Sequence, residues 1–231
     1  MAKSLTFIHG AFNMSPKPII IGLHSNVGKS GKDTLTEMLN AERFAFGDAL
    51  KEECARALTE TQEEYAAVLM AMHNQQLKDK PDASLAIKRI PHGFWSSYLY
   101  AQWHPSLDPS APRSPRWHIQ MYGTMRRNEN SEYWVNVIRD QIADFKSSSE
   151  GFRKEFIVVS DVRMPNELEM VRQMGGKVFT VKRTWYDKLD DVPKHSSDTA
   201  LDGFELPIIN NIFGNPEGML EQLKEYIREQ I

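Results

Sequence analysis

Short apolar runs rich in β-branched residues alternate along the chain with stretches in which apolar residues recur at helical spacing. Residues 18–22 and 156–161 are the clearest apolar runs, and each suits a strand that is buried on both faces. A polar loop with glycines follows the first run at 23–31, and a helical pattern then extends from 32 to about 40. Strand, loop and helix in this order form the context that a phosphate-binding loop requires.

Further elements follow from the same two signals, apolar runs for strands and helical spacing for helices. We expect strands at 43–47, 177–181 and 206–210, and helices at 49–58, 60–77, 117–145 (with a break near 126–131), 166–174 and 217–231. Because strands alternate with helices, the pattern predicts an α/β fold in which a parallel sheet is covered by helices on both faces.

Residues 92–117 differ from the rest of the chain in composition. They contain three tryptophans and two tyrosines together with four prolines. Prolines at this density argue against a regular helix after residue 104. We therefore expect an irregular insertion, whose aromatic side chains either stack on a base or simply pack in the core.

Composition and charge narrow the classes of partner. The 231 residues carry a formal net charge of −3, with 28 basic and 31 acidic side chains. This balance gives no general attraction to nucleic acid or to an anionic membrane, so an anionic ligand must be held by a local basic cluster. No apolar run approaches the ~20 residues of a membrane span, the start lacks a signal-peptide core, and Cys54 is the only cysteine. We expect a cytoplasmic protein that binds neither nucleic acid nor membrane.

The most informative stretch is the loop from Ser25 to Thr34, with the sequence S-N-V-G-K-S-G-K-D-T. Phosphates are held by inward-pointing backbone N–H groups above a helix N-terminus, and glycine lets the chain turn without a side chain that blocks the anion. The common pattern G-x-x-x-x-G-K-[ST] is not matched cleanly in either of two registers. A generic glycine- and serine-rich loop is the alternative interpretation.

We prefer the register in which Gly31 and Lys32 form the Gly-Lys pair, because the helical periodicity begins at Lys32. Asn26 then replaces the first glycine, as a residue that tolerates left-handed dihedral angles, and Asp33 takes the magnesium position. In the other register, which uses Gly28, Lys29 and Ser30, the preceding Gly22 lies one residue too far away. The predicted ATP-binding residues are Asn26, Val27, Gly28, Lys29, Ser30, Gly31, Lys32, Asp33 and Thr34, with Arg183 from a later segment.

A second acidic position, Asp161, follows the strand at 156–160. An acid at the carboxyl end of a buried strand lies beside the phosphate loop in doubly wound folds, where it can hold magnesium or accept a proton. Arg163 could reach the transferred group from the same turn. The alternative for Asp161 is a turn residue or a helix cap, because Pro165 and Asn166 follow closely.

Basic residues cluster at two further places. Lys182 and Arg183 follow the strand at 177–181, and more lysines follow within a dozen residues, which suits either a lid at about 183–200 or a solvated loop. Arg126 and Arg127 form a pair of the kind that clamps phosphate. Lys51 lies one turn into the helix after the second strand, and each of these residues could equally be a surface charge.

At this point the residues resemble a known family. Five segments carry the resemblance, in sequence order: 31–34 (G-K-D-T); 46–51 (F-G-D-A-L-K); 120–124 (Q-M-Y-G-T) with Arg127 and 133–135 (Y-W-V); 158–163 (V-V-S-D-V-R) with 166–167 (N-E); and 195–198 (H-S-S-D) with 201–202 (L-D) and 209–211 (I-N-N). Together the chain resembles bacteriophage deoxynucleoside monophosphate kinases and, more distantly, animal phosphomevalonate kinases. The likeness spans roughly residues 18–225 and places no motif in 60–115.

The resemblance implies a single P-loop kinase domain over residues 1–231, with an acceptor-side insertion at about 60–118 and a lid at about 183–200. The implied reaction moves the γ-phosphoryl group of ATP, with Mg²⁺, to a deoxynucleoside monophosphate and yields the diphosphate, in the host cytoplasm if the protein is encoded by a phage. The expected catalytic residues are Lys32, Asp161, Arg163 and Arg183, the expected metal ligands are Asp33 and Asp161, and the expected acceptor-binding residues are Lys51, Gln120, Thr124, Arg126, Arg127, Trp134 and Arg163.

The sequence departs from the family at two places and leaves several alternatives open. Asn26 replaces the usual first glycine, and the short spacing between Gly123 and Arg127 leaves it undecided whether Arg126 or Arg127 binds the acceptor phosphate. Another small-molecule P-loop kinase, acting on phosphomevalonate or dephospho-coenzyme A, is the first alternative. A nucleotide-dependent switch or accessory ATPase and a non-catalytic P-loop protein are the others. A homodimer is possible, and the accepted bases are left open.

Overall fold

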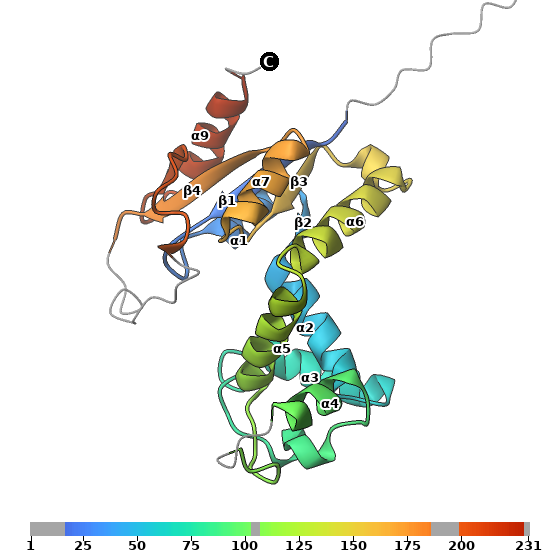
Figure 1. Cartoon of the computed structure of the whole chain (residues 1–231). Coiled ribbons are helices and arrows are strands. Elements are labelled where there is room, and N and C mark those ends of the chain that lie inside the picture. Colours follow the sequence, from blue (N-terminus) through green and yellow to red (C-terminus); the bar gives the residue numbers. More distant parts are fainter. Residues whose placement is uncertain (1–16, 103–106, 186–198, 229–231) are drawn as a thin grey trace, which may run out of the picture.

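Five parallel strands form the centre of the molecule. The computed structural model describes residues 17–102, 107–185 and 199–228 (Figure 1). The strands are β1 (Ile19–His24), β2 (Glu42–Phe44), β3 (Phe156–Val159), β4 (Lys177–Arg183) and β5 (Ile208–Asn211), and within the sheet they lie in the order β2-β3-β1-β4-β5. Every neighbouring pair is parallel, so the carboxyl ends of all five strands meet at one edge.

The helices of the described residues follow the strands closely. They are α1 (Lys32–Met38), α2 (Phe46–Ala57), α3 (Gln62–His73), α4 (Phe94–Ala101), α5 (Pro115–Glu129), α6 (Tyr133–Ser147), α7 (Pro165–Gln173) and α9 (Glu217–Arg228), with short 3₁₀ turns at Ala83–Leu85, Ile87–Arg89 and Gly151–Arg153. Local sequence signals explain where α3 and α5 begin. Thr61 and Glu64 form a reciprocal capping box at the start of α3, and Ser114 caps α5, which has proline in its first turn.

Both faces of the sheet are covered, as the sequence predicts. On one face Ile21, Val158 and Phe179 pack with Leu35 of α1 and Leu223 of α9. On the other face the strand residues join a larger cluster with α2, α6 and α7, which continues into the rest of the chain. Successive residues of β1, β3 and β4 contribute to opposite clusters, because side chains alternate across a sheet. The α/β fold with a parallel sheet is thereby confirmed.

Three sequence predictions differ from the structure, and a fourth falls mostly outside the described residues. Residues 46 and 47 belong to α2 and not to the second strand, because Phe46 turns into the core as the first helical residue. The segment 92–117 is not irregular throughout, since α4 occupies Phe94–Ala101. The strand at 177–181 continues to Arg183, so Lys182 and Arg183 lie in the sheet rather than in a following loop. Most of the predicted lid, 186–198, lies outside the described residues.

A helical lobe extends away from the sheet. It consists of α3, α4, the 3₁₀ turns between them and the start of α5, and it is joined to the sheet through the long helices α2 and α5 (Figure 1). The lobe has its own buried residues, including Trp95 and Leu99 of α4, which belong to the larger core cluster. Among the described helices, none has the length and apolar character needed to cross a membrane.

Candidate functional site

The loop between β1 and α1 adopts the conformation that a phosphate loop needs. Two of its residues have positive φ angles: Lys29 at 54° and Gly31 at 104°. Gly31 directly precedes Lys32, the first residue of α1, so the Gly-Lys pair of the preferred register sits at a helix N-terminus. The predicted reason for Asn26 is wrong, because Asn26 is not among the described residues with positive φ.

The ends of β4 and β5 anchor this loop. The Arg183 guanidinium donates a hydrogen bond of 2.5 Å to the carbonyl oxygen of Gly28, and the Asn211 side-chain amide donates one of 2.9 Å to the carbonyl oxygen of Ser30. Both side chains are buried. A Cβ on Gly31 would lie 2.4 Å from the Asn211 amide nitrogen, so glycine is required there for space as well as for its φ angle. Arg183 therefore shapes the loop from within the sheet.

Asn26 belongs to a chain of side-chain contacts at the opening of the loop. Its amide nitrogen donates to Asp202 at 2.7 Å, and its amide oxygen lies 2.5 Å from His24 Nε2. His24 Nδ1 in turn lies 2.9 Å from the carbonyl oxygen of Val162. Because His24 is 3% exposed and ends β1, these contacts tie the start of the loop to the turn after β3.

The other residues of the predicted ATP site lie along the loop and the first turn of α1. Lys32 is half-buried, and its ammonium lies 3.4 Å from the Ser30 hydroxyl. Lys29, Asp33 and Thr34 are exposed. The structure thus brings the residues predicted from 26 to 34 together around one helix N-terminus, where backbone N–H groups and cations favour an anion.

Asp161 acts as a cap for α2, not for the helix after Pro165 to which the alternative interpretation referred. Its two carboxylate oxygens accept hydrogen bonds of 2.8 Å from the backbone N–H groups of Phe46 and Gly47, the first two residues of α2. A Cβ on Gly47 would lie 3.1 Å from the carboxylate, so glycine permits this close approach. Burial raises the pKa of Asp161, and the two N–H groups oppose that rise. The carboxylate thereby joins the N-terminus of α2 to the carboxyl end of β3.

Glu167 belongs to a segment of the family resemblance, but the sequence reasoning assigned it no role. One of its carboxylate oxygens accepts hydrogen bonds from the backbone N–H groups of Arg163 (2.7 Å) and Met164 (3.0 Å). The side chain is 4% exposed, and burial raises its pKa to about 7. Glu167 therefore fixes the turn that carries Arg163. Its position three residues after Met164, at the start of a helix, was the available signal.

Arg126 and Arg127 have different environments. The Arg126 guanidinium donates to Glu53 of α2 at 2.6 and 2.8 Å, and the hydroxyl groups of Tyr122 and Tyr133 donate to the same carboxylate at 2.8–2.9 Å. The rings of Phe94, Tyr122 and Tyr133 surround the guanidinium at 4.7–5.3 Å. This Glu53 network ties α2, α5 and α6 together, and it neutralises the charge of Arg126.

Arg127 is the next residue of α5, about 100° further around the helix. It is exposed, and within the described part of the chain no group forms a hydrogen bond or ion pair with its guanidinium. A Cβ on Gly123, one turn earlier, would lie 3.4 Å from the Arg127 guanidinium, so glycine leaves room for the side chain along the helix. The charge of Arg127 also lowers the pKa of Glu167, against the larger effect of burial.

The remaining predicted acceptor residues divide into exposed and buried ones. Lys51 donates to Asp48 at 2.9 Å, and Asp48 also accepts two bonds of 2.5–2.6 Å from Arg43. Gln120 and Thr124 are exposed on α5, where the Thr124 hydroxyl donates to the Gln120 carbonyl oxygen. Trp134 is 2% exposed and packs in the core cluster, so the structure corrects its placement in the acceptor site.

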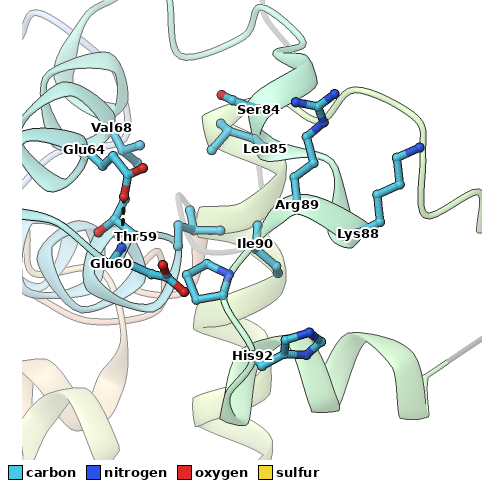
Figure 2. A pocket seen from close by; sticks show the side chains of 12 residues that line it. Thr59, Glu60, Glu64, Val68, Ser84, Leu85, Lys88, Arg89, Ile90 and His92 are labelled. Carbon is cyan, nitrogen blue, oxygen red and sulfur yellow. Dashed lines mark hydrogen bonds between the residues drawn. The ribbon is translucent and has the colours of Figure 1, made fainter.

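The described cavities lie elsewhere. One of about 340 Å³ lies in the helical lobe and is lined by the end of α2, α3 and the segment 84–92, with Glu60 and Glu64 among its residues and Lys88 and Arg89 extending from its rim (Figure 2). None of the predicted site residues lines it. Among the described residues there is also no cluster of three or more His, Cys, Asp or Glu side chains that could hold a metal by itself.

Comparisons with known proteins bear on this arrangement. A solved structure, that of TT1252 from Thermus thermophilus, is 13% identical, with 93% of this chain and 98% of that chain covered and a TM-score of 0.39. No curated protein sequence matches the chain. The model of the deoxynucleotide monophosphate kinase family matches residues 111–227, which is just over half of the chain. The matched segment contains Arg127, Asp161, Arg163, Glu167, Arg183 and Asn211, and the chain belongs to the deoxynucleotide monophosphate kinase family.

Proposed function

We propose that the protein binds ATP on the loop at 26–34 and transfers its γ-phosphoryl group to a deoxynucleoside monophosphate held between α2, α5 and the β3–α7 turn. The single observation that carries this proposal is the position of Asp161. Its carboxylate joins the N-terminus of α2 to the strand end beside the phosphate loop. The proposed donor and acceptor sites are therefore neighbours on one edge of the sheet.

Charge compensation is the main contribution that we assign to the protein. Two polyanions repel each other, and phosphoryl transfer depends on in-line positioning and electrostatic stabilisation. On the donor side we assign the β- and γ-phosphates to Lys32, with Lys29 as a further cation. The acceptor phosphate is largely ionised near pH 7, since its second pKa is about 6, so the attacking oxygen needs no strong general base.

On the acceptor side we assign the phosphate to Arg127 rather than Arg126. Arg126 is already bonded to Glu53, whereas the Arg127 guanidinium is exposed. Arg163 is the proposed partner of the transferred group, because Glu167 fixes its backbone. Lys51 is the third acceptor cation, shared with Asp48. Gln120 and Thr124, exposed on the same helix as Arg127, are proposed to contact the nucleotide, with the helical lobe at the far side.

The donor set suits magnesium. Mg²⁺ prefers oxygen ligands and is commonly bound by one or two carboxylates together with phosphate oxygens and water. Asp33 is exposed in the first turn of α1, and each oxygen of Asp161 accepts one hydrogen bond and retains further lone pairs. We propose that these two residues hold the ion, which would neutralise phosphate charge when bound.

The test is an acceptor screen. Purified protein is incubated with ATP, Mg²⁺ and each deoxynucleoside monophosphate in turn, and ADP and the diphosphate are followed by chromatography. We expect a diphosphate product from one or more of the acceptors and none from the Lys32→Ala variant, which should remain folded by circular dichroism. Transfer to phosphomevalonate or dephospho-coenzyme A instead, or full activity of Lys32→Ala, would contradict the proposal.

A further inference from the structure

Both ring nitrogens of His24 face oxygen atoms. The side chain ends β1 and is 3% exposed. Its Nδ1 lies 2.9 Å from the carbonyl oxygen of Val162, and its Nε2 lies 2.5 Å from the side-chain oxygen of Asn26. A carbonyl or amide oxygen only accepts hydrogen bonds, and a neutral imidazole carries one N–H and one lone pair. A neutral ring would therefore leave one nitrogen lone pair directed at an oxygen.

The orientation of the Asn26 amide is fixed by its other partner. The amide nitrogen donates to a carboxylate oxygen of Asp202 at 2.7 Å. Turning the amide over would present an N–H to His24, but it would also set the amide oxygen against that carboxylate. Asp202 is exposed, and an exposed carboxylate is ionised near pH 7, when it only accepts. The amide oxygen therefore faces His24, and satisfying both contacts of the ring requires a proton on each nitrogen.

We propose that His24 is held as an imidazolium and serves as a positioning residue for phosphoryl transfer. The ring joins Asn26, at the opening of the phosphate loop, to Val162, which precedes Arg163 in the β3–α7 turn. Through Asn26 it also reaches Asp202, in the segment that follows the predicted lid. We name these contacts of Asp202, Asn26, His24 and Val162 the His24 bridge. The proposal rests on the proposed function, because it takes the loop to hold the donor phosphates and Arg163 to meet the transferred group.

Asn26 makes the His24 bridge possible. It stands where the phosphate-loop pattern has its first glycine, and a glycine has no side chain that reaches either His24 or Asp202. Asn26 is not among the described residues with a positive φ angle, so its backbone conformation does not explain why asparagine is used. Its side chain instead forms two hydrogen bonds, and these explain why an amide occupies the position.

The partners of His24 compensate the charge of an imidazolium. A buried cation is costly unless it is hydrogen-bonded or paired. The Val162 carbonyl and the Asn26 amide turn the negative ends of their dipoles toward the ring, and Asp202 supplies a full negative charge beyond the amide. The negative charge of Asp202 therefore favours the protonated ring.

The other charged residues around this end of β1 are mostly cations. In β4 the residue paired with His24 is Thr180, which is uncharged. The charged residues of the segments that meet this end of β1 are Lys29 and Lys32 of the loop and α1, Asp161 and Arg163 of the β3–α7 turn, Glu167 of α7, and Lys182 and Arg183 of β4. Because five of these seven are basic, removal of the Asp202 charge should favour the neutral ring.

The first measurement observes the protonation state of the ring directly. The ring nitrogens of the full wild-type chain are observed by ¹⁵N NMR near pH 7, and His24 is assigned through bonds to the backbone of β1. An imidazolium shows two protonated nitrogens, whereas a neutral ring shows one protonated and one bare nitrogen. We expect the imidazolium in wild type and a larger neutral fraction in Asn26→Gly and Asp202→Asn. A neutral ring in wild type, or the same ratio in all three proteins, would overturn the proposal.

Steady-state kinetics then tests the positioning role. The kcat and KM values for ATP and for the acceptor are measured from about pH 5 to 9, which spans the range in which histidine titrates. The proteins are wild type, His24→Gln, Asn26→Gly, the double variant and Asp202→Asn. His92→Gln is the matched control, because His92 is an exposed histidine of the helical lobe. Circular dichroism shows whether each variant is folded.

We expect His24→Gln to lower kcat/KM for ATP about 10-fold, the effect of losing a charged hydrogen bond, with the acceptor KM unchanged. The same substitution should cost less than about 2-fold in the Asn26→Gly background, where the His24 bridge is already absent. Raising the pH should lower the wild-type value as His24 loses its second proton, and Asp202→Asn should move this decline to lower pH. His92→Gln should match wild type.

Glu167, whose pKa is about 7, also titrates in this range, so the assignment depends on the differences between variants. An equal loss from His24→Gln in both backgrounds, or the same alkaline decline in wild type and Asp202→Asn, would contradict the proposal. If His24→Gln does not fold, the NMR spectra and the pH profiles of Asn26→Gly and Asp202→Asn still decide. The proposed function fails separately, if wild type transfers no phosphoryl group to any deoxynucleoside monophosphate, because the NMR measurement needs no substrate.

Discussion

Arg126 and Arg127 are adjacent in the chain, yet they do different work because successive residues of a helix point about 100° apart. Arg126 faces Glu53 and three aromatic rings at the junction of α2, α5 and α6. Arg127 is exposed and lies outside this network. A guanidinium that is already neutralised by a carboxylate has less to offer a phosphate than an exposed one.

Substitution of each arginine should separate the two roles. We expect Arg127→Ala to raise the KM for the acceptor by about 10- to 100-fold, the effect of losing a charged hydrogen bond, with the KM for ATP and the thermal midpoint unchanged. Arg126→Ala should instead lower the stability by about 1–3 kcal/mol, because the Glu53 carboxylate loses its cation. Steady-state kinetics of both variants measures the KM values, and thermal denaturation measures their stability. A larger acceptor effect from Arg126→Ala would reverse our assignment.

At the scale of elements, the turn from β3 into α7 is held by two carboxylates with different tasks. Asp161 binds the N-terminus of α2 and so connects two elements far apart in sequence. Glu167 binds the backbone of the turn itself. Burial raises the pKa of both residues, to about 7 for Glu167. The state of this turn is therefore sensitive to pH in the neutral range.

The direction of the effect of Glu167 on stability follows from the linkage between proton binding and folding. The folded protein holds the proton up to a pKa of about 7, whereas the unfolded chain releases it near 4.5. The folded state thus binds more protons between these values, and the contribution of Glu167 to the free energy of unfolding falls as pH rises from about 4.5 to 7.

Glu167→Gln keeps the single oxygen that accepts both N–H bonds and cannot ionise. We expect the variant to gain stability relative to wild type at pH 8 but not at pH 4, measured by urea denaturation. A constant difference between the two pH values would contradict this.

At the scale of the whole molecule, the helical lobe is joined to the sheet through α2 and α5, and its packing includes a buried histidine. His118 is 0% exposed, and its Nε2 lies 2.8 Å from the carbonyl oxygen of Leu85. Its Nδ1 accepts a hydrogen bond of 3.2 Å from the indole N–H of Trp95. Protonation of Nδ1 would make it a hydrogen-bond donor that faces another donor, the indole N–H of Trp95. Burial lowers the pKa of His118 to about 4.

Acid should therefore destabilise the lobe through His118. Between pH 6.5 and about 4 the unfolded chain binds a proton that the folded protein does not. The free energy of unfolding contributed by this group is complete above pH 6.5 and falls by up to about 3 kcal/mol as pH drops to 4. His118→Gln keeps a donor and an acceptor but does not titrate. Urea denaturation of both proteins from pH 4 to 7 should show a shallower acid decline in the variant, and identical slopes would contradict the assignment. The comparison of variants is needed because Glu167 acts in the opposite direction over part of this range.

The sequence by itself determined the elements and the phosphate loop, because both depend on local signals. Short apolar runs located the strands and helical spacing located most helices, and the break near Arg126–Ser131 corresponds to the boundary between α5 and α6. The Gly31–Lys32 pair lies at the start of α1, where helical periodicity begins. The errors at 43–47 and 182–183 are errors at element ends, where packing outweighs local preference. In 92–117 a whole helix, α4, was missed.

The tertiary structure decided which charged side chains are bonded to other parts of the chain and which are exposed. Asp161 caps a helix 115 residues away in sequence, Arg183 and Asn211 reach the phosphate loop from later strands, and Glu53 selects Arg126 over Arg127. No local pattern contains these pairings, because each requires two segments to meet only after the sheet has formed. Trp134 was misplaced for the same reason. The sequence around an aromatic residue is the same whether its side chain faces a ligand or the core, and only the packing of α6 showed that Trp134 is buried.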